Sequence, residues 1–375
     1  MSDLKRVLAA SVAVLVALSA VADAAKYDPR MALENSVTEK GVQWLDGRYL
    51  PLEGKMFTDV ERFYDRLPRN VTTAVNGGVR GMKCHSAGMQ FRFRTDSPTL
   101  TFRWVPINRS LAMDHMPATG VSGIDVYRFD AVKGRWRYVK TGRITSANGA
   151  SLTLDWMPGT PCLVNLPLYN GIREFSLGVD PEASVSPLPP RASGVEKPVV
   201  FYGTSITHGG CASRPGLAFP SIVGRTLDVP IVNLGFSGSG KMEFEMSEHL
   251  AAIDASCYVL DCLWNMHDGL VKERYEPFIR NLRAKRPGVP IVMAEQCDVY
   301  CRPPCAKDVF IKALYDKLVA EGWKDLVYLP KDGMYTGDIE GTVDGCHPND
   351  WGMMSMGKAF SVGVAQALKL PAPRK

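Results

Sequence analysis

Three polar side chains in the second half of the chain have the types and spacing of a nucleophile with its proton shuttle. Ser205 follows the apolar residues 198–202 in the stretch PVVFYGTSITHGG, and Asp344 precedes His347 by three residues near the C-terminus. An aspartate at that spacing can fix the tautomer of the histidine, which can then take the proton of a serine hydroxyl. A serine after a strand can also serve only as a helix cap. If the three residues meet in space, they predict attack of Ser205 on an acyl carbonyl.

Two further stretches supply candidate donors for the negative charge that such an attack creates. Gly238 ends the stretch NLGFSG, and a glycine lets its backbone N–H approach a tetrahedral oxyanion closely. Asn265, in the stretch LWNM, can donate from its side-chain amide. We therefore predict an oxyanion hole formed by the backbone N–H groups of Ser205 and Gly238 and the side chain of Asn265.

These residues require a fold that brings distant loops together, and the pattern of residues 198–368 predicts one. Short β-type runs alternate with helical stretches. The runs lie at 199–202, 231–234, 257–262, 289–295 and 326–329, and the helical stretches at 218–227, 271–284, 306–321 and 350–368. Five strands joined by helices favour an α/β fold with a flavodoxin-like, doubly wound parallel sheet. The carboxyl ends of such strands share one edge, where loops far apart in sequence can meet.

The upstream half shows a different pattern, in which β-type runs follow one another without a long helical stretch. Runs at 89–95, 99–105, 124–130, 136–142 and 162–168 are separated by Gly, Pro and Asn. This pattern predicts an antiparallel, jelly-roll-like β-sandwich. Residues 181–197 are rich in proline and favour neither helix nor strand, so we place a domain boundary there. The expected domains are a β-sandwich at 25–190 and a catalytic domain at 191–375.

The motifs of the second half match a known family, because residues 198–368 resemble the SGNH hydrolases, also called GDSL esterases and lipases. The letters of that name fall on Ser205, Gly238, Asn265 and His347, and Asp344 completes the family's D-x-x-H. The upstream half resembles the companion β-sandwich of one branch of the superfamily. That branch is named for a GxDLY motif, which reads GIDVY at residues 123–127 here.

Two departures from the family pattern stand close to the motif residues. Thr204 replaces the aspartate of the GDS block, at a position that holds no reacting group. Leu263 and Met266 replace the glycine and the second polar residue of the usual G-x-N-D, which points to a change at the acyl pocket.

The resemblance implies a serine esterase that removes a short acyl group from a carbohydrate. We expect this group to be acetyl. No metal or organic cofactor is expected, and the expected partner is a small-molecule or polysaccharide acyl ester. Two other functions stay open. The same triad could transfer the acyl group to an alcohol, or the sandwich could make the chain chiefly a glycan-binding protein.

A phosphate-binding motif is a competing interpretation of the loop that holds Gly238. Residues 235–241, GFSGSGK, fit G-x-x-x-x-G-K. However, Met242 stands where the Mg²⁺-binding Ser or Thr of a P-loop belongs. We therefore favour the oxyanion role for this loop.

Three other histidines could in principle compete with His347 as the base. His208 and His267 lie close in sequence to Ser205 and Asn265, but neither has a carboxylate at the D-x-x-H spacing. We expect both to contact substrate or solvent. His115 lies in the sandwich half and could reach the cleft if the domains pack edge to face, but we expect a packing role or a local hydrogen bond for it.

Composition and charge limit the possible partners. The chain has 375 residues, 46% hydrophobic and 22% charged, with a net charge of +5, which is typical of a soluble protein large enough for two domains. No run of basic and aromatic residues suggests a nucleic-acid partner. Residues 1–24 combine Lys5-Arg6, an apolar stretch and small residues, the layout of a cleavable secretory signal. We expect a periplasmic or secreted protein without a stable membrane anchor, whose oligomeric state the sequence does not indicate.

Nine cysteines are compatible with an oxidising compartment, although their odd number leaves at least one unpaired within a single chain. Cys297, Cys301 and Cys305 have a spacing that is unusual for a metal site. We therefore expect disulfides in this loop.

Overall fold

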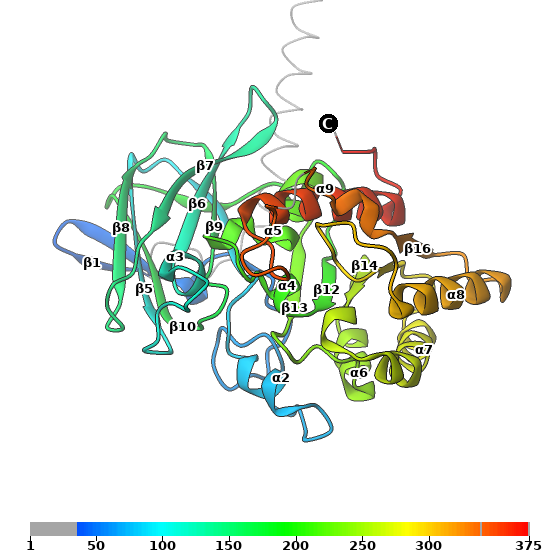
Figure 1. Ribbon diagram of the computed structural model, residues 1–375. Helices are drawn as coiled ribbons and strands as arrows, with labels where there is room; N and C mark the ends of the chain where they lie inside the picture. The colour runs from blue at the N-terminus through cyan, green and yellow to red at the C-terminus, as the bar shows by residue number, and fades with distance from the viewer. Residues whose placement is uncertain (1–35, 338–339, 374–375) are drawn as a thin grey trace, which may run out of the picture.

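Two antiparallel sheets form the first half of the chain (Figure 1). The computed structural model describes residues 36–337 and 340–373, so the predicted signal sequence lies outside the described residues. One sheet has the order β1-β2-β10-β5-β8, and the other has the order β11-β4-β9-β6-β7 with β3 beside β4. The strands are β1 (Val37–Glu39), β2 (Val42–Asp46), β3 (Leu52–Glu53), β4 (Gln90–Thr95), β5 (Thr99–Pro106), β6 (Ile124–Asp130), β7 (Arg135–Gly142), β8 (Ala150–Asp155), β9 (Pro161–Asn165), β10 (Ile172–Val179) and β11 (Val185–Pro187).

The core of the sandwich lies between its two sheets, because alternate side chains of each strand point inwards. Phe91 of β4 stacks on Phe175 of β10 with ring centroids 4.4 Å apart, and Phe102 and Trp104 of β5 lie in the same cluster. The predicted β-sandwich is thus confirmed.

The second half contains a five-stranded parallel sheet of order β13-β12-β14-β15-β16. Its strands are β12 (Val199–Gly203), β13 (Ile231–Gly235), β14 (Cys257–Asp261), β15 (Ile291–Ala294) and β16 (Leu326–Leu329). Every residue of β12, β13 and β14 is buried, as expected for strands covered on both faces. The strand order reverses at β12, which has β13 on one side and β14 on the other, and ligands bind at such a switch point. The predicted flavodoxin-like sheet is confirmed.

Helices cover both faces of this sheet (Figure 1). Helices α5 (Phe219–Leu227) and α9 (Asp350–Leu368) pack on the face to which Val199 and Phe201 point. Helices α6 (Phe244–Ala251), α7 (Asp268–Lys285) and α8 (Ala306–Ala320) pack on the other face, against Val200 and Tyr202. Among the described residues, no helix is both long and apolar enough to span a lipid bilayer.

The segment between β3 and β4 leaves the sandwich and packs on the parallel sheet. It contains α2 (Gly77–Met82), whose cap residue Asn76 accepts a hydrogen bond from the N–H of Val79 at 3.1 Å. Asn76 also donates to the carbonyl of Ser239 at 2.7 Å, across to the other half. Leu67 and Val79 share a core cluster with residues of β12 and β13. The first half therefore contributes directly to the packing around the parallel sheet.

The GIDVY motif at residues 123–127 fastens the two halves together. Asp125, which is fully buried, accepts hydrogen bonds from Arg214 at 2.7 Å and from the N–H of Gly216 at 2.9 Å. The hydroxyl of Tyr127 contacts the same guanidinium, and Asn165 donates to the other oxygen of Asp125 at 2.8 Å. The acidic and tyrosine positions of the motif thus hold residues 214–216 of the second half.

Several elements were not predicted. Strand β10 was missed because a bulge between Ile172 and Glu174 breaks its alternation. Helices α2 and α6 were missed because they have only six and eight residues. The expected strand at 162–168 ends at Asn165, before Pro167, which has no N–H for the sheet.

Candidate active site

Ser205 lies at the carboxyl edge of the parallel sheet, directly after β12. Thr204 caps the short helix α4 (Ser205–His208) by accepting a hydrogen bond from the N–H of Ile206 at 3.2 Å. Gly209 ends the helix with a φ of 116°, a conformation that favours glycine. Ser205 is the first helical residue, so its own N–H has no partner within the helix. Its side chain faces the loop that carries His347.

A chain of hydrogen bonds joins the three predicted polar residues. Ser205 Oγ and His347 Nε2 are 2.8 Å apart, and His347 Nδ1 and Asp344 Oδ2 are 2.7 Å apart. Asp344 Oδ1 accepts from the N–H groups of Cys346 and His347 at 3.0 and 2.7 Å. Although partial burial opposes ionisation, these N–H groups and the His347 ring lower the pKa of Asp344. The carboxylate is therefore held in its charged form beside the imidazole.

Gly238 and Asn265 lie at the same sheet edge as Ser205. The loop that holds Gly238 crosses the end of β12, where the N–H of Phe236 donates to the carbonyl of Gly203 at 3.0 Å. Gly238 is exposed, has a φ of 64°, and has open space around it. Asn265, in the 3-10 helix η5 (Leu263–Asn265), donates to the carbonyls of Phe236 and Gly240 at 3.3 and 3.4 Å. Its amide must turn away from these long bonds to reach an oxyanion.

Two glycines of the P-loop-like stretch, Gly235 and Gly240, lie tightly against neighbouring backbone. A Cβ on Gly235 would lie 2.2 Å from the backbone nitrogen of His208, and one on Gly240 would lie 2.0 Å from the carbonyl oxygen of Gly203. Helix α6 begins only at Phe244. The loop is therefore closed against α4 at Gly235 and against β12 at Gly240, while Gly238 between them stays open.

A polar network from the first half supports helix α4, which begins with Ser205. Tyr169 donates its hydroxyl hydrogen to the carbonyl of Ser205 at 3.0 Å and stacks on the ring of His208 at 4.2 Å. His208 Nε2 lies 3.3 Å from His85 Nδ1 and 3.4 Å from a guanidinium nitrogen of Arg66. The prediction that His208 contacts substrate or solvent is therefore wrong, because residues of the first half bury it completely.

Arg66 is a fully buried cation whose two terminal nitrogens donate to backbone carbonyls, while its Nε has no partner among the described residues. It donates to the carbonyls of Asn233, Gly235 and Met82 at 3.0, 2.9 and 3.0 Å, and it lies 4.6 Å from the ring centroid of Phe236. Burial lowers the pKa of Arg66 to about 9, so the side chain stays charged at neutral pH. It thereby ties the end of β13, which leads to Gly238, to the first half of the chain.

The histidines in this network are neutral at pH 7. Burial and the nearby Arg66 lower the pKa of His85 to about 3, and the same two causes move the pKa of His208 well below its usual value. Neither residue is suited to act as the base at neutral pH. Sequence reasoning missed Arg66, His85 and Tyr169, because no spacing or strand position connects them with Ser205.

His267 and His115, the other two histidines singled out in the sequence, lie at the surface. His267 caps α7 by accepting a hydrogen bond from the N–H of Leu270 at 3.2 Å. His115 does reach the cleft, since its ring lies edge-on to that of His347 with centroids 5.7 Å apart. A metal ion could be held by three residues here, because one ring nitrogen each of His115 and His347 and one carboxylate oxygen of Asp344 all lie within 4.8 Å of one another.

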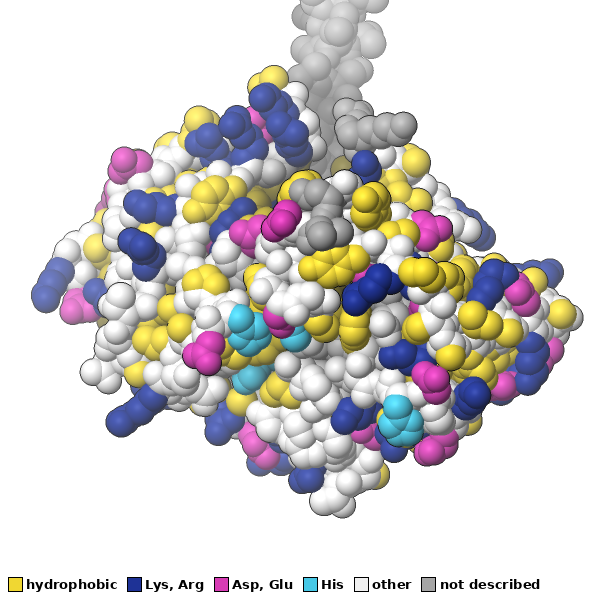
Figure 2. Space-filling view, in the orientation of Figure 1, with side chains coloured by type: hydrophobic (Ala, Val, Ile, Leu, Met, Phe, Trp, Pro, Cys, Tyr) yellow, Lys and Arg dark blue, Asp and Glu magenta, His cyan; other side chains and the backbone are white. Residues whose placement is uncertain are grey.

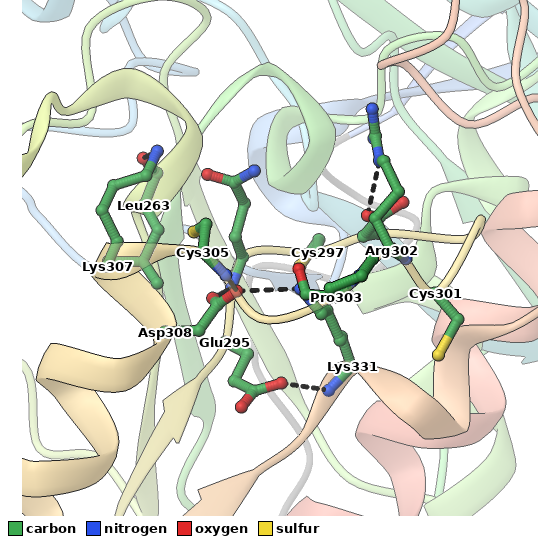
Figure 3. A network of polar contacts seen from close by, with 12 residues as sticks. Leu263, Glu295, Cys297, Cys301, Arg302, Pro303, Cys305, Lys307, Asp308 and Lys331 are labelled. Atoms are coloured by element: carbon green, nitrogen blue, oxygen red, sulfur yellow. Dashed lines mark hydrogen bonds and ion pairs between the residues drawn. The ribbon is translucent and has the colours of Figure 1, made fainter.

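The prediction of disulfides in the loop of Cys297, Cys301 and Cys305 is wrong, because all nine cysteines are free thiols. Cys301 and Cys305 point apart on opposite sides of their loop, away from Cys297 (Figure 3). A buried ion pair between Lys331 and Asp308, at 2.8 Å, fastens this loop instead. The loop thus obtains its order from charge pairing.

Comparisons with known proteins agree with this architecture. The model of the GDSL-like lipase/acylhydrolase family matches residues 196–364, and the GxDLY model, which describes the N-terminus of SGNH-hydrolase-type esterases, matches residues 42–185. No curated protein matches the chain.

Three solved structures illustrate the range of similar proteins. A candidate GDSL-like lipase from Bacteroides ovatus is 30% identical, with 89% of this chain and 100% of that chain covered and a TM-score of 0.79. The salicylyl-acyltransferase of a tetracycline biosynthetic pathway is 17% identical, with 89% and 100% covered and a TM-score of 0.71. A family two carbohydrate esterase from Cellvibrio japonicus is 11% identical, with 88% and 98% covered and a TM-score of 0.55. The last two similarities concern the fold alone.

Proposed function

Because the chain belongs to the GDSL-like lipase and acylhydrolase family, we propose that it is a serine esterase that hydrolyses short-chain acyl esters, in particular acetyl esters of carbohydrates. The observation that carries the proposal is the unbroken chain of hydrogen bonds from Ser205 through His347 to Asp344. A hydroxyl 2.8 Å from an imidazole whose other nitrogen is held by a carboxylate is arranged for nucleophilic attack.

The mechanism follows from the role that each atom can take. Ser205 Oγ attacks the ester carbonyl carbon while His347 Nε2 takes its proton. The resulting oxyanion is held by the N–H groups of Ser205 and Gly238 and by the amide of Asn265. His347 then returns the proton to the oxygen of the leaving alcohol, and the acyl group stays on Ser205. Water, activated by the same imidazole, releases the acid.

Two of the three proposed oxyanion donors have support from their surroundings. The Ser205 N–H is unused within α4, and Gly238 is exposed at the loop that crosses β12. Loss of one oxyanion donor lowers kcat by about 10²- to 10³-fold in other serine hydrolases. We expect Asn265→Ala to lower kcat in this range.

Replacement of the nucleophile is the direct test. Ser205→Ala should abolish hydrolysis of p-nitrophenyl acetate while the melting temperature stays close to that of the wild type. Ser151→Ala is the matched control, since Ser151 is an exposed residue of β8 in the sandwich half, and it should keep its activity. An organophosphate should label the wild type at Ser205 only. Continued turnover by Ser205→Ala would refute the assignment.

The acyl-Ser205 intermediate could also pass its acyl group to an alcohol, because an alcohol can replace water in the second half of the reaction. Titration of a sugar alcohol against a fixed ester concentration measures the partition between acid and new ester. We propose hydrolysis as the main outcome. We also propose export of the protein, on the signal-like composition of residues 1–24.

A further inference from the structure

His115 is held rigidly at the mouth of the candidate active site by a turn of the sandwich half. The backbone groups of Met113 and Met116 exchange two hydrogen bonds, at 3.0 and 3.1 Å, so Asp114 and His115 form the tip of a tight turn. Met116 is 1% exposed and packs in the core cluster that covers one face of the parallel sheet. The turn is thus anchored in the interface between the two halves, while the imidazole at its tip remains exposed.

The ring of His115 is available for a ligand. Among the residues that the structure describes, neither of its ring nitrogens takes part in a hydrogen bond or an ion pair. One of these nitrogens lies within 4.8 Å of a ring nitrogen of His347 and of a carboxylate oxygen of Asp344. In Figure 2 histidine side chains gather near the middle of the face, where the two halves meet. A second imidazole with free hydrogen-bonding capacity thus lies beside the imidazole of the proposed base.

The position of the leaving alcohol follows from the mechanism. His347 must return its proton to the ester oxygen of the leaving group, so that oxygen lies within about 3 Å of Nε2 when the bond breaks. The carbon atoms attached to that oxygen then extend into the space beside His347. Since His115 borders His347 ring to ring, a hydroxyl on the adjacent carbon can approach a His115 nitrogen.

We infer that His115 is a binding residue for the alcohol part of the substrate, where it forms a hydrogen bond with a hydroxyl next to the ester oxygen. This inference rests on the proposed esterase function and narrows its substrates to monoacylated vicinal diols, the arrangement found in partly acetylated sugars. A site that is built to bind a hydroxyl discriminates against an analogue that lacks it, because its polar group is then left without a partner.

Two small esters that differ in one hydroxyl isolate the contact. Ethyl acetate and 2-hydroxyethyl acetate carry the same acyl group, and only the second has a hydroxyl on the adjacent carbon. The ratio of their kcat/KM values is measured by titrating the released acid. EDTA is present throughout, so that a metal bound by His115, Asp344 and His347 cannot affect the result. We expect His115→Ala to lower the preference for 2-hydroxyethyl acetate about five- to tenfold, the value of one hydrogen bond.

Two further variants separate binding from a structural effect. His115→Gln keeps a donor and an acceptor, so it should restore part of the preference. His267→Ala removes another exposed histidine and should leave the ratio at the wild-type value. An equal loss on both esters, or a wild-type ratio in His115→Ala, would overturn the inference while the esterase function stands. A wild-type protein that hydrolyses neither ester would contradict the proposed function itself.

Discussion

The buried carboxyl group of Asp261 should make the free energy of unfolding depend on pH, and the substitution Asp261→Asn should remove this dependence. Asp261 ends β14 and is 1% exposed. The hydroxyl of Thr207, in the nucleophile helix, donates to it at 2.6 Å, and the thiol of Cys297 donates at 2.7 Å. Burial raises the pKa of Asp261 to about 7, and these two donors oppose the rise only partly. The folded protein therefore keeps a proton on Asp261 that the unfolded chain has already released.

The sign and size of the effect follow from this difference in pKa. Below pH 3.8 both states are protonated, and above pH 7 both are ionised. Between these values the folded state binds more protons, so the free energy of unfolding falls as the pH rises. A difference between a pKa of 3.8 and one of about 7 corresponds to about 4 kcal/mol at most. Asp261→Asn does not titrate, so its stability relative to the wild type should increase by about that amount from pH 4 to pH 8.

Urea unfolding of the wild type and Asp261→Asn, followed by tryptophan fluorescence across this pH range, measures the difference. Asp308→Asn, followed below pH 4, is a control of opposite sign. Although burial opposes ionisation of Asp308, the hydrogen bond from Lys331 and two backbone N–H groups lower its pKa. The wild type should therefore lose stability relative to Asp308→Asn as the pH falls through this lowered pKa. A difference between the wild type and Asp261→Asn that stays constant with pH would refute the reasoning.

Four further outcomes are expected. Tyr169→Phe removes the hydrogen bond to the carbonyl of Ser205 and should lower kcat about fivefold with little change in KM, since that bond positions the nucleophile; steady-state kinetics check this. Gly240→Ala would bring a Cβ within 2.0 Å of the carbonyl oxygen of Gly203, so it should lower the melting temperature and the activity, whereas Gly81→Ala, with open space around it, should lower neither. Titration of the unfolded protein with a thiol reagent, without reductant, should count nine free thiols; a count of seven or fewer would show a disulfide. Because the proposed mechanism uses only side chains and backbone N–H groups, dialysis against EDTA should leave the rate unchanged.

The parts of the site that follow strands could be predicted from the sequence. Apolar runs alternating with helices imply a parallel sheet, and a parallel sheet brings the residues after its strands to one edge. Ser205, Gly238 and Asn265 each follow such a run, and Asp344 and His347 share one turn. The geometry of these residues therefore depends on local pattern and on a general rule of topology.

The supporting network could not be predicted in this way, because its members are joined only by tertiary packing. Arg66 lies in a charged segment whose composition is typical of an exposed loop, yet it is buried against the carbonyls at the end of β13. The sequence placed His208 at the cleft because it lies only three residues after Ser205. Its burial depends on Tyr169 and His85, which are far away in sequence. The prediction of disulfides between Cys297, Cys301 and Cys305 failed because the sequence does not reveal the buried Lys331–Asp308 ion pair, which holds this loop instead.

The support that Arg66, His85 and Tyr169 give to the nucleophile helix has a consequence for any shortened or recombined form of the protein. A fragment that starts near residue 196 keeps every residue of the triad but exposes the ring of His208 and frees the end of β13. Such a fragment would keep all the proposed reacting groups but would lose the contacts that hold helix α4 and the end of β13 in place. We therefore expect the two halves to be needed together, and a chimera that exchanges the sandwich of a relative must keep these three side chains.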